Sequence, residues 1–291
     1  MSWAWEELIE LYNKLEADGK PVCPVAHTYI TAHIAILIDK SGNFLAAMNP
    51  DVKGELVAVP CTVESEGRTN NVAPHLISDQ IQYVAEFPQY EVKHQKYIEQ
   101  LKNYLINNPN DLYAEAVYKY TIKGTLMDDI KGLFSEKENI RQKNIVFAVY
   151  GAKTDGRDPL WTDYYINNVL KINGICSITG KPDHIPKSYP RDILAPGDRA
   201  RLFITRENPL DDYPKNAPGY IASQKAIHAL QYIIYGAENK ERVEAEYNIL
   251  HYVKGETERE ELKKWVDGKY PGKWDGLIKI LDNSSNKESA K

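Results

Sequence analysis

Cysteine is scarce in this 291-residue chain, and its spacing argues against the protein classes that depend on it. The three cysteines, Cys23, Cys61 and Cys176, lie far apart and form no C-x-x-C pair. Neither a disulfide-stapled secreted fold nor a cysteine-rich zinc site is therefore expected. The pattern favours a reducing, cytoplasmic location.

Long apolar runs are also missing. No segment approaches the roughly 20 apolar residues that a membrane-spanning helix needs. The N-terminal stretch MSWAWEELIELYNKL carries Glu6, Glu7 and Glu10 and has no basic start, so it does not fit a signal peptide. We expect a soluble cytoplasmic protein with no membrane partner.

An overall excess of positive charge is absent too. The chain has 36 Lys and Arg against 41 Asp and Glu, a net charge of -5. Nucleic-acid binding would therefore need a local basic patch, because phosphate neutralisation requires cations gathered in one place. Residues 176–206 provide one, with a local charge of +3 from six basic and three acidic residues; the basic ones are Lys181, Lys187, Arg191, Arg199, Arg201 and Arg206.

Sequence signatures of catalysis are missing. The chain contains no G-x-S-x-G, H-E-x-x-H or G-x-G-x-x-G, and its GKPDH lacks the spacing of a phosphate-binding loop. His27 and His33 share a face of a predicted strand, but six residues of strand separate them by about 20 Å, too far for one metal ion. We expect no metal and no cofactor.

Two further candidates fit ordinary structural roles better. Cys176 with His184 has the residue types of a thiol nucleophile and base, yet a lone cysteine beside an isoleucine fits a small buried hydrophobe. The pairs at 128–129 and 211–212 are adjacent aspartates, which usually face solvent. The sequence therefore predicts that the chain is not an enzyme.

Hydrophobic periodicity predicts an α+β fold. A helix around Trp5–Leu15 ends near Gly19, and strands at 31–39 and 44–48 form a hairpin through DKSGN. Further strands are predicted at 55–60 and 144–150. Helices are predicted around 76–84, 92–105, 111–122 and 125–135, and one more opens at Pro159.

These elements form a small, mainly antiparallel sheet with a helical insertion across residues 74–140. A helix through Ile221, Ile227, Leu230 and Ile234 follows the basic region. We expect one domain over residues 1–236. A charged helical tail over 237–291 completes the chain, with its polar end DNSSNKESAK disordered.

A compact polar loop stands out before Pro74, formed by Arg68, Thr69, Asn70 and Asn71. Asn pairs with adenine, Arg with guanine or phosphate, and Thr contacts the thymine methyl group. The alternative is a simple turn before a capped helix, since Asn favours turns and caps in any protein. The basic region supports the nucleic-acid interpretation, because holding phosphates and reading bases need separate residues.

The order of several blocks resembles the N-terminal half of the type I-C CRISPR Cascade large subunit, the Csd-type family. The similarity runs from about residue 4 to 235 and includes an Arg-containing loop before P-x-L-x-x-D, a C-x-x-T-G turn and N-A-P before a helix. The blocks here are EELIELYNKL, VAVP with RTNNVAPHLISDQIQYV, NIVF, CSITGKPDHIP, and NAP before SQKAIHALQYII. One departure is FITREN where the family has S-F-N; it keeps only Asn208.

This resemblance implies a function. The large subunit lies beside the 5′ handle of the CRISPR RNA and recognises the protospacer-adjacent motif in target double-stranded DNA. Its partners would be the CRISPR RNA, the other Cascade subunits and a recruited helicase-nuclease that cuts the DNA. Arg68, Thr69, Asn70 and Asn71 would read the motif, and the phosphate contacts would come from Lys53, Lys181, Lys187, Arg191, Arg199 and Arg201.

Family members are longer and finish in a helical bundle, so this chain is expected to be an excised domain or a naturally short variant. Two other functions stay open. A metal-dependent nuclease would need a carboxylate cluster, for which no convincing spacing exists. A structural domain could instead dock on other subunits through a surface rich in tyrosine, of which the chain has 20 against 5 Phe.

Overall fold

The computed structural model describes residues 3–48, 55–66, 68, 71–134, 139–152, 159–187, 189–190 and 217–238. The α+β class is confirmed. Helices α1, α2, α3, α4, α5, α6 and α7 span Trp3–Ala17, Ile81–Val84, Glu91–Asn107, Leu112–Thr121, Leu126–Asp129, Pro159–Tyr164 and Tyr220–Glu238. The short helical turns η1, η2 and η3 span Pro88–Tyr90, Ile140–Gln142 and Tyr165–Val169. Strands β1 to β7 span His27–Ala32, Ile34–Ile38, Phe44–Met48, Glu55–Pro60, Ile145–Val149, Gly174–Ile175 and Pro182–Asp183.

The strands form three small sheets. β1 pairs with β4, and β6 pairs with β7, both antiparallel. β2 lies between β3, with which it forms the predicted antiparallel hairpin, and β5, to which it is parallel. The predicted strand at 31–39 is interrupted at His33, so its two parts pair with different partners.

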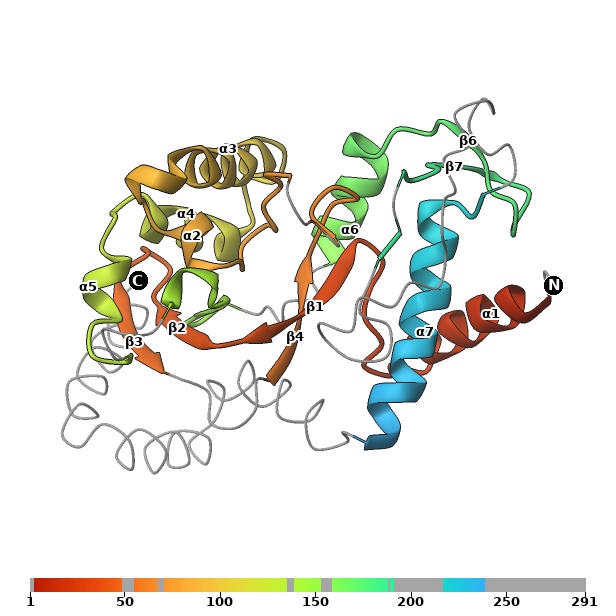
Figure 1. Ribbon diagram of the computed structural model, residues 1–291, viewed down its shortest axis with the longest axis horizontal. Helices are drawn as coiled ribbons and strands as arrows, with labels where there is room; N and C mark the ends of the chain where they lie inside the picture. Colours follow the sequence, from red (N-terminus) through yellow and green to blue (C-terminus); the bar gives the residue numbers. More distant parts are fainter. Residues whose placement is uncertain are drawn as a thin grey trace, which may run out of the picture.

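The elements fall into two groups joined by β1, β4 and α6 (Figure 1). One group holds β2, β3 and β5 with α2 to α5. The other holds α1 and α7, which pack against each other, with β6 and β7 nearby. No helix in the described ranges is both long and apolar enough to cross a membrane.

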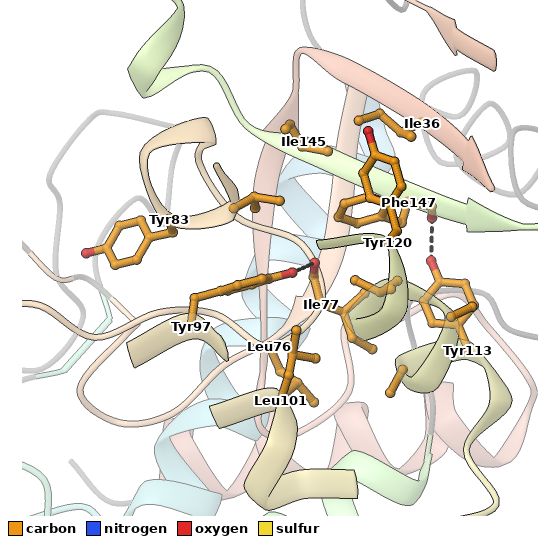
Figure 2. Packing of buried hydrophobic residues seen from close by; sticks show 14 of the residues in the cluster. Ile36, Leu76, Ile77, Tyr83, Tyr97, Leu101, Tyr113, Tyr120, Ile145 and Phe147 are labelled. Carbon is orange, nitrogen blue, oxygen red and sulfur yellow. Dashed lines mark hydrogen bonds between the residues drawn. The ribbon is translucent and has the colours of Figure 1, made fainter. Parts of the chain in front are cut away.

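Tyrosine fills much of the larger core, rather than only the surface as the sequence suggested. Tyr97, Tyr113 and Tyr120 are buried among aliphatic side chains from the central strands and the loop before α2 (Figure 2). The Tyr97 hydroxyl donates to the Ile77 carbonyl, and the Tyr113 hydroxyl donates to the Phe147 carbonyl. A buried phenol needs such an acceptor, so these bonds fix the helices against the strands.

Most of the predicted helices are confirmed. Buried Tyr97, Leu101 and Tyr104 recur along α3 at spacings of four and three residues, which places one face of α3 on the core. The Asp111 carboxylate accepts from the amides of Tyr113 and Ala114 and thereby caps α4. The predicted tail over 237–291 lies outside the described residues, apart from the last turn of α7.

Candidate nucleic-acid interface

The polar loop leaves the sheet at the end of β4 through a turn that is closed by its own side chains. The Thr62 amide donates to Ser65 Oγ at 2.8 Å, and the Ser65 amide donates to Thr62 Oγ1 at 3.1 Å. Tyr165 holds the same turn from α6 and η3, because its hydroxyl accepts from the Val63 amide at 2.9 Å. The chain therefore enters the loop from a fixed point.

Arg68 is not a free side chain on this loop. Its guanidinium forms a bidentate ion pair with Asp79 and also donates to the Ala73 carbonyl at 2.6 Å. The Arg68 Cζ atom lies over the Tyr83 ring, 4.3 Å from its centroid. With the Arg68 side chain 13% exposed and Asp79 fully buried, the pair is part of the protein interior. To contact a base, the guanidinium would have to leave this carboxylate.

The predicted helix around 76–84 is wrong over its first half, and Asp79 is the reason. Helix α2 begins only at Ile81, and Ile77 has a left-handed backbone with φ 67°. Besides Arg68, the Asp79 carboxylate accepts from the amides of His75 and Gln80, at 2.8 and 2.6 Å. These bonds wrap residues 75–80 around the carboxylate, a shape that a continuous helix could not take.

Asn71 is the loop residue that the structure presents to solvent. It is exposed, and its Nδ2 donates to the Glu64 carbonyl at 2.8 Å. Thr69 and Asn70 lie outside the described residues. The prediction that this loop reads bases stays a prediction, with Asn71 as its accessible described member.

A ladder of cations and tyrosines, which sequence reasoning missed, continues from Arg68. Lys93 Nζ lies 5.3 Å from the centroid of the Tyr83 ring and 4.8 Å from that of Tyr90. Arg141 also approaches Tyr90: its Cζ atom lies 6.0 Å from the centroid of the Tyr90 ring. Burial and the nearby Arg68 charge lower the pKa of Lys93. Only the fold brings Arg141 here, so no local pattern signalled it.

The other side of the loop is tied to the C-terminal helix. Gln224 of α7 donates through Nε2 to the Glu66 carboxylate at 2.6 Å, and its Oε1 accepts from the Ala26 amide at 2.9 Å. Burial raises the pKa of Glu66 to about 8, so this acid is neutral at pH 7. The chain before the loop is thus anchored by Glu66, and Arg68 ties the first loop residue to Ala73 and Asp79 on the far side.

The basic region is only partly described. Lys181 and Lys187 lie exposed around β7, whereas Arg191, Arg199 and Arg201 lie outside the described residues, as does Lys53. Asp183 has a structural role: its carboxylate accepts from backbone amides at the start of α7 and from the His184 amide at 2.7 Å. The start of α7 is thereby fixed next to the region predicted to hold phosphates.

The residues considered for catalysis make separate contacts. Cys176 Sγ is buried and accepts from the Gly219 amide at 3.2 Å, and His184 Nδ1 lies 2.6 Å from the Lys171 carbonyl. His27 Nδ1 lies 3.0 Å from the Val25 carbonyl, while His33 Nδ1 accepts from the Asn144 amide. Among the residues with described positions, no group of three or more His, Cys, Asp or Glu is placed to hold a metal ion.

The comparison with protein families agrees with the blocks found in the sequence. The family model described as CRISPR-associated protein (Cas_Csd1) matches residues 8–286. Among the curated proteins searched, none matches the chain. Because the family match covers nearly the whole chain, the chain belongs to the Csd1 family of CRISPR-associated proteins, and the predicted resemblance to the Csd-type family is confirmed.

Proposed function

From this membership, we propose that the chain is the nucleic-acid-binding large subunit of an RNA-guided type I-C surveillance complex. Its polar loop contacts the protospacer-adjacent motif of target double-stranded DNA, and its basic region contacts the 5′ handle of the CRISPR RNA. Other Cascade subunits hold it in the complex. It has no catalytic role, and a recruited helicase-nuclease cuts the DNA.

One observation carries the proposal: exposed Asn71 lies on a loop whose described flanks are fixed on both sides. The Glu66–Gln224 bond fixes the chain before the loop, and Asp79, which binds Arg68 and the His75 amide, fixes the chain after it. A base reader gains from such preorganisation, because less conformational freedom is lost on binding. An amide group can then distinguish bases through a paired donor and acceptor.

The ladder of Arg68, Lys93 and Arg141 with Tyr83 and Tyr90 also favours nucleic-acid binding beside the loop. Lys93 and Arg141 bring positive charge close to the loop, and Tyr90, the half-buried tyrosine of the ladder, suits contact with an unstacked base. Positioning on phosphates and reading of bases would then come from neighbouring but separate residues.

The burial of Arg68 favours a second candidate, a structural docking domain without base readout of its own. In that case the loop would be a rigid element of the fold, and its Arg would serve only Asp79. The two functions differ in whether DNA sequence changes the affinity.

The test is binding of a panel of short DNA duplexes by fluorescence anisotropy, at low and moderate salt. Asn71→Ala is the informative variant, because it removes one exposed amide and a single bond to the Glu64 carbonyl. We expect it to flatten the preference among duplexes by about tenfold, as the loss of one base contact does. Asn110→Ala, at another exposed loop position, is the matched control and should leave the preference unchanged.

The basic region is tested on the same panel. Replacing Arg191, Arg199 and Arg201 together by Ala should weaken binding on every duplex and lower the salt slope by about 2 to 3. Absence of any sequence preference in the unmodified protein would contradict base readout and leave the docking domain as the better account.

A further inference from the structure

A pocket opens next to the polar loop, between α3, α6 and η3. Its volume is about 320 Å³, and its wall includes Thr62, from the turn before the loop, and Pro74, which follows the loop. This size falls at the lower end of the range of small-ligand pockets, about 300 to 1,000 Å³. The pocket is therefore large enough for one small planar ligand and too small for a helix or a strand.

Its lining combines aromatic and amide side chains with two charged ones, Lys96 and Glu99. Trp161 and Tyr164 line one side, with their ring centroids 5.8 Å apart. Trp161 is buried and fixed by its indole N–H, which donates to the Ala26 carbonyl at 2.9 Å, whereas Tyr164 is half-buried and offers more of its ring. Gln100 and Asn103 of α3 line the pocket as well.

Gln100 is the most informative of these residues. Its Oε1 is buried and has no hydrogen-bond partner among the described residues. A buried acceptor without a partner is costly, and such a group commonly awaits a ligand or a water molecule. A small rotation of the Gln100 amide would bring Oε1 within reach of a hydrogen-bond donor in the pocket.

The pocket lining also includes a cation. Lys96, one turn before Gln100 on α3, lines the pocket, is exposed and donates to the Val72 carbonyl at 3.3 Å. A planar heterocycle with N–H donors, linked to a phosphate, would match all three features: aromatic rings, a free amide oxygen and an ammonium group.

We propose that this pocket binds one unpaired nucleotide, its base against Tyr164 and Trp161, its edge hydrogen-bonded to Gln100 or Asn103, and its phosphate beside Lys96. This inference rests on the proposed function, because it places a splayed-out base beside the loop that contacts the duplex. The nucleotide could come from an opened DNA strand or from RNA, which share this chemistry.

The experiment uses the full chain and single-stranded oligonucleotides of about ten residues, a length within the usual site size, each with one 2-aminopurine. One set is DNA, the other RNA of the same sequence. Stacking on the half-buried Tyr164 should quench the 2-aminopurine fluorescence on binding. The set that shows the quenching identifies the source of the nucleotide.

Variants connect the signal to the pocket. Tyr164→Leu and Lys96→Ala should each weaken the quenching titration by about tenfold, the effect of losing one stacked base or one phosphate contact. Gln100→Leu should weaken it as well and should leave thermal unfolding unharmed, because it removes an acceptor that has no partner. Lys102→Ala, an exposed lysine on α3 that does not line the pocket, is the matched control.

The outcomes separate this inference from the function it rests on. If neither DNA nor RNA is quenched, or if quenching persists unchanged in both Tyr164→Leu and Gln100→Leu, the pocket does not bind a base. Duplex binding that still depends on Asn71 would then leave the proposed function standing without this inference. Quenching that all three pocket variants weaken, with Lys102→Ala unaffected, supports the pocket.

Discussion

Two buried acids hold the described flanks of the polar loop, and each is balanced in a different way. Asp79 accepts from the Arg68 guanidinium and from two backbone amides, so a charged pair is fully hydrogen-bonded inside the protein. The described side-chain partner of Glu66 is the neutral amide of Gln224, and burial raises the pKa of Glu66 to about 8. Asp79 is thus charged and paired with Arg68, whereas Glu66 keeps its proton because it is buried.

Glu66 predicts that stability declines as pH rises toward about 8 and levels off above that value. The folded chain keeps this proton up to about pH 8, whereas the unfolded chain releases it near its ordinary value of 4.5. Raising the pH through this interval therefore favours unfolding, by up to about 1.4 kcal/mol per pH unit. Urea unfolding between pH 6.5 and about 9 measures it.

Glu66→Gln is the control, because it keeps the shape of the side chain without the ionisable proton; it should flatten the decline in stability between pH 6.5 and about 8. Below pH 6.5 the sign is opposite for His75 and His228, since burial lowers the pKa of each to about 3. If the free energy of unfolding fell equally with pH between 6.5 and about 8 in the original protein and in Glu66→Gln, Glu66 would not be responsible.

At the scale of the elements, the start of α7 is the junction on which several sequence blocks meet. Asp183 of β7 caps the helix, Cys176 Sγ accepts from the Gly219 amide, and the Tyr220 amide donates to the His184 carbonyl at 2.7 Å. The C-x-x-T-G turn and the N-A-P segment are thus neighbours in space. Their shared role here is to orient α7.

Gly219→Ala should loosen this junction. A Cβ atom at Gly219 would lie 2.1 Å from Asp183 Oδ2, so the capping carboxylate would have to move away. We expect a loss of about 1 to 3 kcal/mol in the free energy of unfolding, from overpacking and the weakened cap. Asp183→Asn keeps a capping oxygen and should cost less; a Gly219→Ala protein as stable as the original would contradict this account.

Elements with a local cause could be predicted, and those with a distant cause could not. The β2–β3 hairpin follows from DKSGN, where the Asp39 carboxylate accepts from the amides of Ser41 and Asn43. The non-helical course of 76–80 depends on Arg68, and the parallel pairing of β2 with β5 joins Ile34 to Ile145. No local pattern carries such information.

The site follows the same rule. The loop before Pro74 was visible as a cluster of polar residues, and the exposure of Asn71 agrees with it. The partner of Arg68, the buried state of Glu66 and the approach of Lys93 and Arg141 to Tyr90 all depend on contacts between separate elements. Sequence reasoning therefore found the position of the candidate site and missed how it is held.

Across the whole molecule, Gln224 joins three distant parts of the chain. Its amide links the Ala26 backbone before β1, the Glu66 side chain after β4, and α7 itself. This one side chain therefore connects the α1–α7 group of elements to the sheet that leads into the polar loop.

Gln224→Leu should weaken the fold at all three places together. The change leaves the Ala26 amide without its acceptor and Glu66 without its donor, at about 1 to 3 kcal/mol for each buried group. Hydrogen–deuterium exchange should quicken at Ala26 and along the turn from Thr62 to Glu66. Lys225, the next residue on α7, contacts Asn13 and the Tyr12 ring of α1 instead. Lys225→Ala should leave Ala26 and the turn protected; faster exchange confined to α7 would contradict the link.

The core tyrosines fix the orientation of their rings through hydrogen bonds. A core of phenylalanine can shift or turn its rings at small cost as long as the volume is filled. Here the hydroxyls of Tyr97, Tyr104 and Tyr113 each have to reach one particular oxygen, so a ring that fits but points elsewhere leaves an acceptor and a donor unpaired. Loosening this interior into a compact state with mobile side chains therefore costs these hydrogen bonds as well as packing, so such a state is disfavoured.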